Sequence, residues 1–522
     1  GSWLNSLDVA QRYAQGEYYS VFAQTQNESL NKIVDILEGN YQDIGQHLNT
    51  NANGFHMDDQ AITDKANFEF IKSYYDVCTN RDLTASLGPT SMFDDFVLIQ
   101  HQLFPLNATT HHYASILAFF TQQGIVNTLL ATDYSMSDTN HLLNDVYFYG
   151  PDAAQIPEFE HPSVAKAIAS ILARPDNQTD NAQFAIQQSQ QTGFEFWTDE
   201  KIASAAIHYV DLMQQLKNLT QMSTDYSNIT LEDAQKAIST VDLLAYLGHL
   251  VEGLDASTAH GFTFKADLGY LQKLNTLLLE TPDQTLQEYF VIEYLLEKSI
   301  YISLPPTNTT NTTMALSMRD WIDKKLSRRA PSTPQSVKQA CASDVSKTFP
   351  DAIGRYFVLD SFGGLDDKQA LSSFVDTLKQ SWLRQIPHAS FLDEQTAIQA
   401  YNKIDLLKPH VAYRNASPDW QDPASLQLYY ANQTIDTRSY YKAKQSASLE
   451  NSKRYWKRLL ELNPEVTWST DGYPEQVNAF YITQKNQIEI PIGILQKPMY
   501  STGVPKYINY GALGSAIGHE LV

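Results

Sequence analysis

The chain has 522 residues and a mass of 58.9 kDa, which is enough for about three domains of ordinary size. Hydrophobic residues make up 43% and aromatic residues 11%, so the composition excludes a wholly disordered chain. The 37 Lys and Arg residues against 59 Asp and Glu residues leave a net charge of −22, which argues against a partner that is a nucleic acid.

The first four-fifths of the chain shows the hydrophobic period of α-helices. Apolar residues recur at helical spacing in Leu30–Leu37 and again in Leu243–Leu250. The second of these segments is opened by Thr230–Asp233, which resembles a capping box. The apolar and aromatic run Leu286–Leu296 predicts a buried helix. We interpret all of these stripes as core packing.

Residues 305–335 break the helical pattern. Pro305–Thr313 is low in complexity, and Lys324–Arg329 is basic, so the composition predicts an exposed linker. Arg328-Arg329 has the form of a dibasic processing site for a secretory-pathway protease. The preferred interpretation is a solvated basic patch.

The pattern changes again near residue 480. Val477–Thr483 and Ile488–Ile492 are rich in β-forming residues, and Lys485–Gln487 between them has the composition of a turn. These segments predict a β-hairpin. Downstream, Leu513, Ile517 and Leu521 share one face of a helix predicted over Ala512–Val522.

That last helix contains His519 and Glu520 as an adjacent pair. Alone, such a pair carries almost no functional signal. A His at the following position 523 would complete the pattern H-E-x-x-H. In that pattern two imidazoles one turn apart bind a zinc ion, and the Glu between them acts as the general base on the metal-bound water.

The two cysteines, Cys78 and Cys341, do not by themselves decide between free thiols and a disulfide. Nine Asn-x-Ser/Thr sequons favour an oxidising compartment, since each is a plausible site for a glycan. No apolar run of about 18 residues is present, and Gly1–Leu4 lacks the features of a signal peptide. We expect a secreted or extracellular protein with a Cys78–Cys341 disulfide, which would hold the chain together if it were cut at Arg328-Arg329. The sequons begin at Asn27, Asn107, Asn177, Asn218, Asn228, Asn308, Asn311, Asn415 and Asn432.

Several blocks, taken in order and with their spacing, resemble the neprilysin and endothelin-converting-enzyme family of zinc metallopeptidases. The specific blocks are Val477–Tyr481, Asn486–Ile488, Pro491–Pro498, Ile508–Gly511 and Gly518–Glu520. Weaker similarity extends to Leu392–Lys403, Gly354–Tyr356, Tyr74–Cys78 and Gly1–Leu4.

The resemblance implies a mainly α-helical fold with a small β portion and two lobes that enclose a chamber. Residues 1–435 would form a large helical lobe that covers the substrate chamber. Residues 436–522 would form the N-terminal part of a thermolysin-like catalytic domain. The implied activity is that of an endopeptidase that cleaves small peptides before hydrophobic residues, either secreted or as the ectodomain of a type II membrane protein.

The resemblance also implies roles for individual residues. His519 would be the first zinc ligand and Glu520 the general base, while Asn478 and Ala479 would bind the backbone of the substrate. Ile494 and Met499 match positions that line the pocket for the residue after the scissile bond. Ser515 and Ala516 stand where the better-known members carry larger apolar residues, so the preference of that pocket is left open. Cys78 and Cys341 match a family disulfide.

A catalytic zinc site needs three protein ligands, and this sequence supplies only His519 of the set that the resemblance implies. The remaining ligands are expected beyond Val522, so that the chain alone would lack a complete metal site. A second chain carrying the remainder of the catalytic domain is one expected partner. The alternatives are an inactive proteolytic fragment and a non-catalytic secreted binding protein on the same scaffold.

Overall fold

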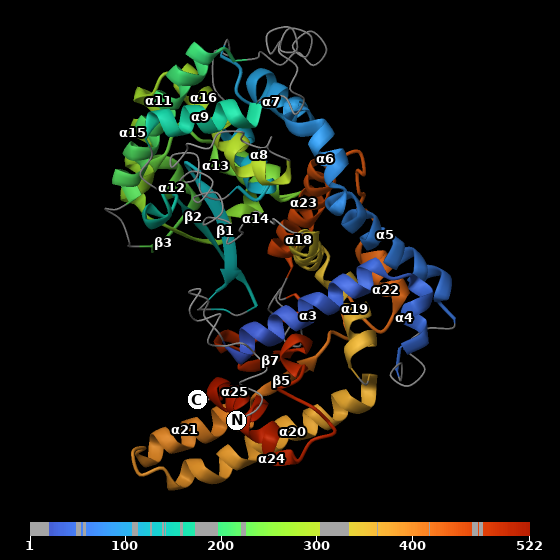
Figure 1. Ribbon diagram of the computed structural model, residues 1–522. Coiled ribbons are helices and arrows are strands. Elements are labelled where there is room, and N and C mark those ends of the chain that lie inside the picture. Colours follow the sequence, from blue (N-terminus) through green and yellow to red (C-terminus); the bar gives the residue numbers. More distant parts are fainter. Residues whose placement is uncertain are drawn as a thin grey trace. The chain divides into compact units, whose positions relative to one another are not determined.

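Figure 1 shows the computed structural model, in which helices dominate, as the sequence predicts. The chain forms two compact units, one of residues 1–75, 333–432 and 464–522 and the other of residues 76–332 and 433–463. The predicted single division at residue 435 stays a prediction about the lobes of the protein. The structure describes residues 20–47, 54–55, 59–106, 113–125, 128–137, 140, 142–156, 160–172, 197–220, 226–302, 334–362, 364–416, 418–461, 468 and 473–521.

The unit that begins at residue 76 packs helices around one extensive apolar core, with a four-stranded sheet of order β1-β2-β4-β3. In this sheet β1 and β2 are antiparallel, β2 and β4 parallel, and β3 and β4 antiparallel. Its strands are β1 (Ala131–Met136), β2 (Asn144–Tyr149), β3 (Ser227–Ile229) and β4 (Thr263–Ala266). Its helices are α6 (Arg81–Leu87), α7 (Phe93–Leu98), α8 (Tyr113–Gln122), α9 (His161–Leu172), α11 (Asp199–Thr220), α12 (Leu231–Ala237), α13 (Leu243–Leu250), α14 (Ala256–His260), α15 (Leu268–Glu280), α16 (Asp283–Lys298) and α23 (Tyr440–Lys457).

The predicted helices of this unit are present, with one correction. The capping box at Thr230 opens α12, which ends at Ala237, and not the helix that contains Leu243–Leu250. That helix, α13, has its own cap, because the side chain of Asp242 accepts a hydrogen bond from the backbone N–H of Ala245. The predicted buried helix over Leu286–Leu296 is the central part of α16.

The other unit combines helices with a three-stranded sheet of order β5-β7-β6, in which β5 is parallel to β7 and β6 is antiparallel to it. The strands are β5 (Lys408–Ala412), β6 (Phe480–Ile482) and β7 (Gln487–Pro491). The helices are α3 (Val21–Glu38), α4 (Tyr41–His47), most of α5 (Ala61–Thr79), α18 (Pro334–Thr348), α19 (Pro350–Ser361), α20 (Gly364–Gln385), α21 (Glu394–Asp405), α22 (Pro423–Tyr429), α24 (Lys506–Gly511) and α25 (Leu513–Glu520).

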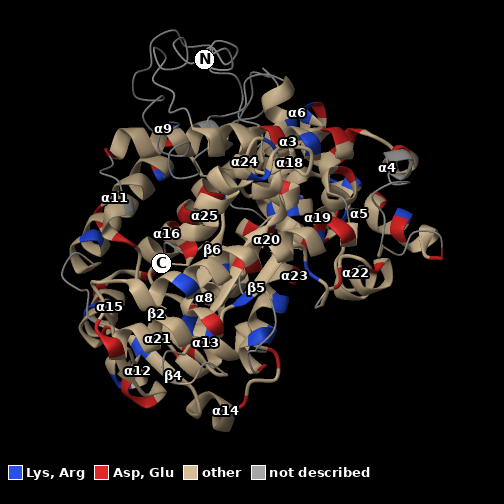
Figure 2. Cartoon of the chain, turned by 90° about the horizontal axis from the view of Figure 1, so that it is seen from below, with Lys and Arg blue, Asp and Glu red and all other residues tan. Residues whose placement is uncertain are grey.

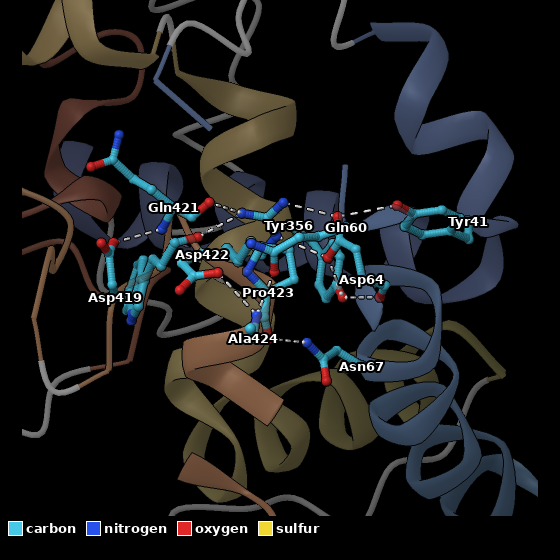
Figure 3. Close-up of polar contacts among 12 residues, drawn as sticks. Tyr41, Gln60, Asp64, Asn67, Tyr356, Asp419, Gln421, Asp422, Pro423 and Ala424 are labelled. Atoms are coloured by element: carbon cyan, nitrogen blue, oxygen red, sulfur yellow. Dashed lines mark hydrogen bonds and ion pairs between the residues drawn. The ribbon is translucent and has the colours of Figure 1, made fainter. Parts of the chain in front are cut away.

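A buried polar network holds α5, α19 and the loop before α22 together (Figure 3). Arg355 on α19 pairs with Asp64 on α5, and both side chains are fully buried. The Arg355 guanidinium also donates to the backbone carbonyls of Trp420 and Gln421. Asn67 donates to the carbonyl of Pro423 at the start of α22. The network therefore fixes this loop against two helices that are distant from it in the sequence.

The cysteines behave as expected from the sequence. Cys78, near the end of α5, and Cys341, on α18, are both disulfide-bonded and nearly fully buried. The hydroxyl of Tyr74 on α5 donates to the carboxylate of Asp344 on α18 at 2.5 Å. Nearly all of the predicted linker, residues 305–335, lies outside the described residues, including Arg328-Arg329. Only its last two residues are described, and α18 begins there at Pro334.

Charged residues of both signs are scattered among one another along the helices that the structure describes (Figure 2). None of these helices combines the length and the apolar character that spanning a membrane requires.

Candidate active site

The predicted hairpin is present and forms one side of the candidate site, but its first strand is shorter than the predicted Val477–Thr483 and covers only Phe480–Ile482. Strands β6 and β7 pair with Tyr481 opposite Ile488, and a short 3₁₀ turn, Thr483–Lys485, connects them. Asn486 closes the turn in the left-handed conformation, with φ at 48°, which asparagine tolerates better than most residues. Strand β7 is buried throughout, because β5 and β6 flank it. Strand β6 lies at the edge of the sheet, and its outer side pairs with no other described strand.

Asn478 and Ala479 lie just before this edge strand. Asn478 is exposed, whereas Ala479 is 5% exposed. The amide oxygen of Asn478 accepts a hydrogen bond from the backbone N–H of Ala479 at 3.0 Å. Among the described residues, one polar side chain thus lies next to a strand edge that has no partner strand, and an extended peptide can in general add to such an edge.

Ile494 and Met499 lie after β7, and both are buried at 0% and 4% exposure. Ile494 belongs to the 3₁₀ segment Ile492–Leu495, and the N–H of Met499 donates to the carbonyl of Gln496. The carbonyl of Met499 in turn accepts from the N–H of Leu513, the first residue of α25, at 3.2 Å. This bond ties the predicted pocket segment to the helix that carries His519.

The helix α25 is positioned by its neighbours in the same unit. Its apolar face, Leu513, Ile517 and Leu521, is buried as the sequence predicts. Helix α20 contacts both β5 and α25, and its Phe374 stacks on Tyr510 of α24 with ring centroids 4.7 Å apart. The contact with α20 holds α25 in place within this unit, and the described residues leave the opposite face of α25 partly uncovered. Ser515 on that face is exposed and Ala516 half-buried.

His519 is exposed and Glu520 half-buried, in the last turn of α25. Neither side chain has a hydrogen-bond or ion-pair partner among the described residues. An exposed, uncommitted imidazole is a suitable zinc donor, and the adjacent carboxylate is free to act on a water molecule. The described residues contain no group of three or more His, Cys, Asp or Glu side chains that could hold a metal. Among the described residues, His519 is therefore a suitable zinc ligand, but the other ligands of a complete zinc site are not among them.

Two supporting residues on α3 were missed by the sequence analysis. The side-chain oxygen of Gln26 accepts a hydrogen bond from the N–H of Val477, and the Lys32 ammonium donates to the side chain of Gln496 at 2.8 Å. Burial lowers the pKa of Lys32, although the nearby Asp360 and Glu28 oppose the effect. No local pattern marks these residues, because their partners lie in the last fifth of the chain.

In five of the nine predicted glycosylation sequons the asparagine is a described residue. The asparagine is exposed in each of them: Asn27, Asn218, Asn228, Asn415 and Asn432. Asn107, Asn177, Asn308 and Asn311 lie outside the described residues. Modification of these sites stays a prediction.

Comparison with known families identifies the family to which the chain belongs. The N-terminal profile of peptidase family M13 matches residues 1–414, and the second profile of the same family matches residues 478–522, which carry the hairpin and α25. The chain belongs to peptidase family M13. The predicted resemblance to neprilysin and the endothelin-converting enzymes is confirmed.

Curated relatives of this chain carry the names of these two groups. The chain is 30% identical to Neprilysin-3 of Drosophila melanogaster over 36% of this chain and 23% of that protein. It is 26% identical to human Endothelin-converting enzyme-like 1 over 62% of this chain and 40% of that protein. These matches span less than half the length of each curated relative.

Solved structures share the M13 fold at lower identity. The zinc metalloprotease ZMP1 of Mycobacterium tuberculosis in its open state has a TM-score of 0.68 and 17% identity, covering 98% of this chain and 72% of that chain. PepO of Lactobacillus rhamnosis gives a TM-score of 0.65 at 17% identity, covering 96% and 71% of the two chains. At this identity the similarity concerns the fold alone.

Proposed function

We propose that the protein to which this M13 chain belongs is a zinc-dependent endopeptidase of the neprilysin type that cleaves small peptides before hydrophobic residues. One observation carries the proposal. Within one compact unit, an open strand edge with exposed Asn478 is followed by a helix that exposes His519 beside Glu520.

Binding of the peptide would use the edge at β6. An extended peptide can continue the β5-β7-β6 sheet by pairing its backbone with the open side of β6. The Asn478 side-chain amide both donates and accepts, so it can fix the register of the peptide backbone next to Ala479. We assign the pocket for the residue after the scissile bond to Ile494 and Met499.

In the chemical step, Glu520 would accept a proton from the attacking water and then deliver it to the amine that leaves. His519 would contribute one of the protein ligands that hold zinc, and the others would come from outside the described residues. Zinc bound there would supply the Lewis acidity that polarises the peptide carbonyl and activates water. We also propose lobes at residues 1–435 and 436–522.

The exposed sequon asparagines and the Cys78–Cys341 disulfide support a secreted or extracellular glycoprotein. That location would place the enzyme among extracellular peptides.

The test uses the whole protein, purified from a secretory host, with a fluorogenic peptide that contains a bulky apolar residue. We expect cleavage on the amino side of that residue and loss of cleavage with a chelator. Glu520→Gln should retain zinc, measured by mass spectrometry of the metal, and lose turnover by at least about 100-fold. His519→Ala should lose both zinc and turnover. Cleavage that resists chelation, or an active Glu520→Gln protein, would reject the mechanism.

A further inference from the structure

The segment immediately before β6 is held from two sides by residues that the catalytic assignment does not include. We propose that Gln26 and Gly493 are positioning residues that set the place of Asn478 and Ala479 for binding the substrate. This inference rests on the proposed peptidase function. Its structural basis is a backbone hydrogen bond on one side and a close backbone approach on the other.

The hydrogen bond comes from α3. The side-chain oxygen of Gln26 accepts from the N–H of Val477 at 2.9 Å, one residue before Asn478. Val477 is 8% exposed and precedes β6, which begins at Phe480, so no strand supplies its acceptor. A buried backbone N–H without a partner is costly. Gln26 therefore supplies the hydrogen-bond acceptor that a partner strand would otherwise provide, at the start of the proposed substrate-binding segment.

The close approach comes from Gly493, between β7 and Ile494. A Cβ atom placed on Gly493 would lie 2.3 Å from the carbonyl oxygen of Gln476 and 2.6 Å from the carbonyl carbon of Glu475. Both neighbours are backbone atoms, which cannot rotate away as a side chain can. The glycine is required for space, and it lets the chain after β7 lie directly against residues 475–476.

The same helix also contacts the chain on the pocket side. Helix α3 packs on the 3₁₀ segment Ile492–Leu495, and Lys32 donates to the side chain of Gln496 at 2.8 Å. The segment 475–479 and the segment that contains the pocket residue Ile494 are thus both held by the same helix, α3. A helix near the start of the chain sets the distance between the edge that would bind the peptide backbone and the pocket that would bind its side chain.

Loss of the Gln26 acceptor should loosen Asn478 without touching His519 or Glu520, which lie on α25. Peptide binding should weaken while the chemical step is preserved. Since a single hydrogen bond is removed, we expect KM to rise about 5- to 10-fold and kcat to change less than about 2-fold.

The experiment compares Gln26→Ala, Gln26→Glu and Gln24→Ala in the whole protein. Gln26→Glu keeps an acceptor and should restore KM to within about 2-fold of the wild type. Gln24→Ala is the matched control, since Gln24 lies on the same helix and its side-chain amide donates to Glu28, one turn further along that helix, at 2.7 Å. Gly493→Ala should reproduce the rise in KM.

A second measurement does not depend on turnover. In the Glu520→Gln background, the affinity for a fluorescein-labelled hexapeptide, Ala-Ala-Gly-Phe-Leu-Ala, is measured by anisotropy with and without Gln26→Ala. Hydrogen exchange of the Val477 amide is followed in the same proteins. We expect about 5- to 10-fold weaker binding and faster exchange at Val477 in the Gln26→Ala protein.

The outcomes separate the two proposals. If the wild type binds the hexapeptide without cleaving it, the peptidase proposal fails, and weaker binding by Gln26→Ala still supports the positioning role. If cleavage occurs but Gln26→Ala leaves both KM and hexapeptide affinity unchanged, the positioning role is overturned and the peptidase function stands. An equal effect of Gln24→Ala would also overturn it, because the effect would then belong to the helix as a whole.

Discussion

Arg355 grips Asp64 through two hydrogen bonds of 2.9 Å each, from Nε to one carboxylate oxygen and from a terminal nitrogen to the other. Both side chains have zero exposure. The hydroxyl of Tyr356 donates to the backbone carbonyl of Asp64 at 2.8 Å, and Tyr41 donates to its carboxylate at 3.1 Å. Each charge is therefore neutralised by its partner inside the protein, and neither side chain is accessible to water.

Replacing Arg355 with Met should lower the free energy of unfolding by about 3–5 kcal/mol, because the Asp64 carboxylate is left buried without its counter-ion. Urea unfolding followed by tryptophan fluorescence measures the change. Lys338→Ala is the control, since Lys338 pairs with Glu38 at 2.7 Å where both side chains are more than a third exposed. That change should cost at most about 1 kcal/mol. If the two variants lowered the free energy of unfolding by similar amounts, burial would not explain the importance of the Arg355–Asp64 pair.

The stability of the protein should depend on pH through Glu475, which is 1% exposed and has one carboxyl oxygen without a hydrogen-bond partner among the described residues. Burial raises the pKa of this carboxyl to about 7 from 4.5, although Lys347 opposes the effect. Between these values the folded state keeps a proton that the unfolded chain releases. The contribution of Glu475 is therefore most favourable below pH 4.5 and is lost as pH rises through about 7.

For this one group the free energy of unfolding should fall by about 1.4 kcal/mol per pH unit within that window. Glu475→Gln should remove this part of the slope, and Glu69→Gln, at an exposed position of α5, should leave it in place. Chemical unfolding at several pH values between about 5 and 7.5 measures both slopes. Equal slopes in the wild type and the Glu475→Gln protein would show that Glu475 does not titrate in this range.

Local pattern was sufficient for the hairpin and the last helix. The turn residue Asn486 and the stripe Leu513, Ile517 and Leu521 each depend on neighbours within a few positions, and each has its predicted place. The boundary between α12 and α13 was hidden because Ile238 and Val241 in the connection are fully buried and continue the apolar pattern.

Long-range relationships escaped the sequence. Strand β5 contains a proline and few β-forming residues, and it becomes a strand by pairing with β7 far along the chain. The sheet of the other unit was also missed, although Val146–Tyr149 in β2 offered a β-rich signal. The contact of Gln26 with Val477 has no local signature at all. A single sequence does not show which segments, far apart along the chain, are joined by hydrogen bonds.

Two changes that abolish the same sequon should separate glycosylation from folding. Asn228 is exposed on β3, whereas Thr230 caps α12, since its hydroxyl accepts from the N–H of Asp233 at 3.1 Å. Thr230→Ala should lose the cap and lower the free energy of unfolding by about 1 kcal/mol. Asn228→Gln should change it by less than about 0.5 kcal/mol.

Mass spectrometry before and after glycosidase treatment should show the same missing glycan in both variants, and urea unfolding after deglycosylation measures their stability. Thr230→Ser keeps both the cap and the sequon, so a loss of stability in that variant would contradict the cap assignment.

The Cys78–Cys341 disulfide should stabilise the protein and also keep it in one piece. Replacing both cysteines with serine should cost about 2–4 kcal/mol, because the unfolded chain gains freedom over the long loop that the bond closes. Both residues are buried, at 4% and 3% exposure, so a mild reductant followed by a thiol-alkylating reagent should label neither cysteine until the protein is unfolded. Since residues 78 and 341 flank Arg328-Arg329, a protein cut there should run as one band on a denaturing gel without reductant and as two with it. Separation without reductant, or a double variant as stable as the wild type, would contradict this role.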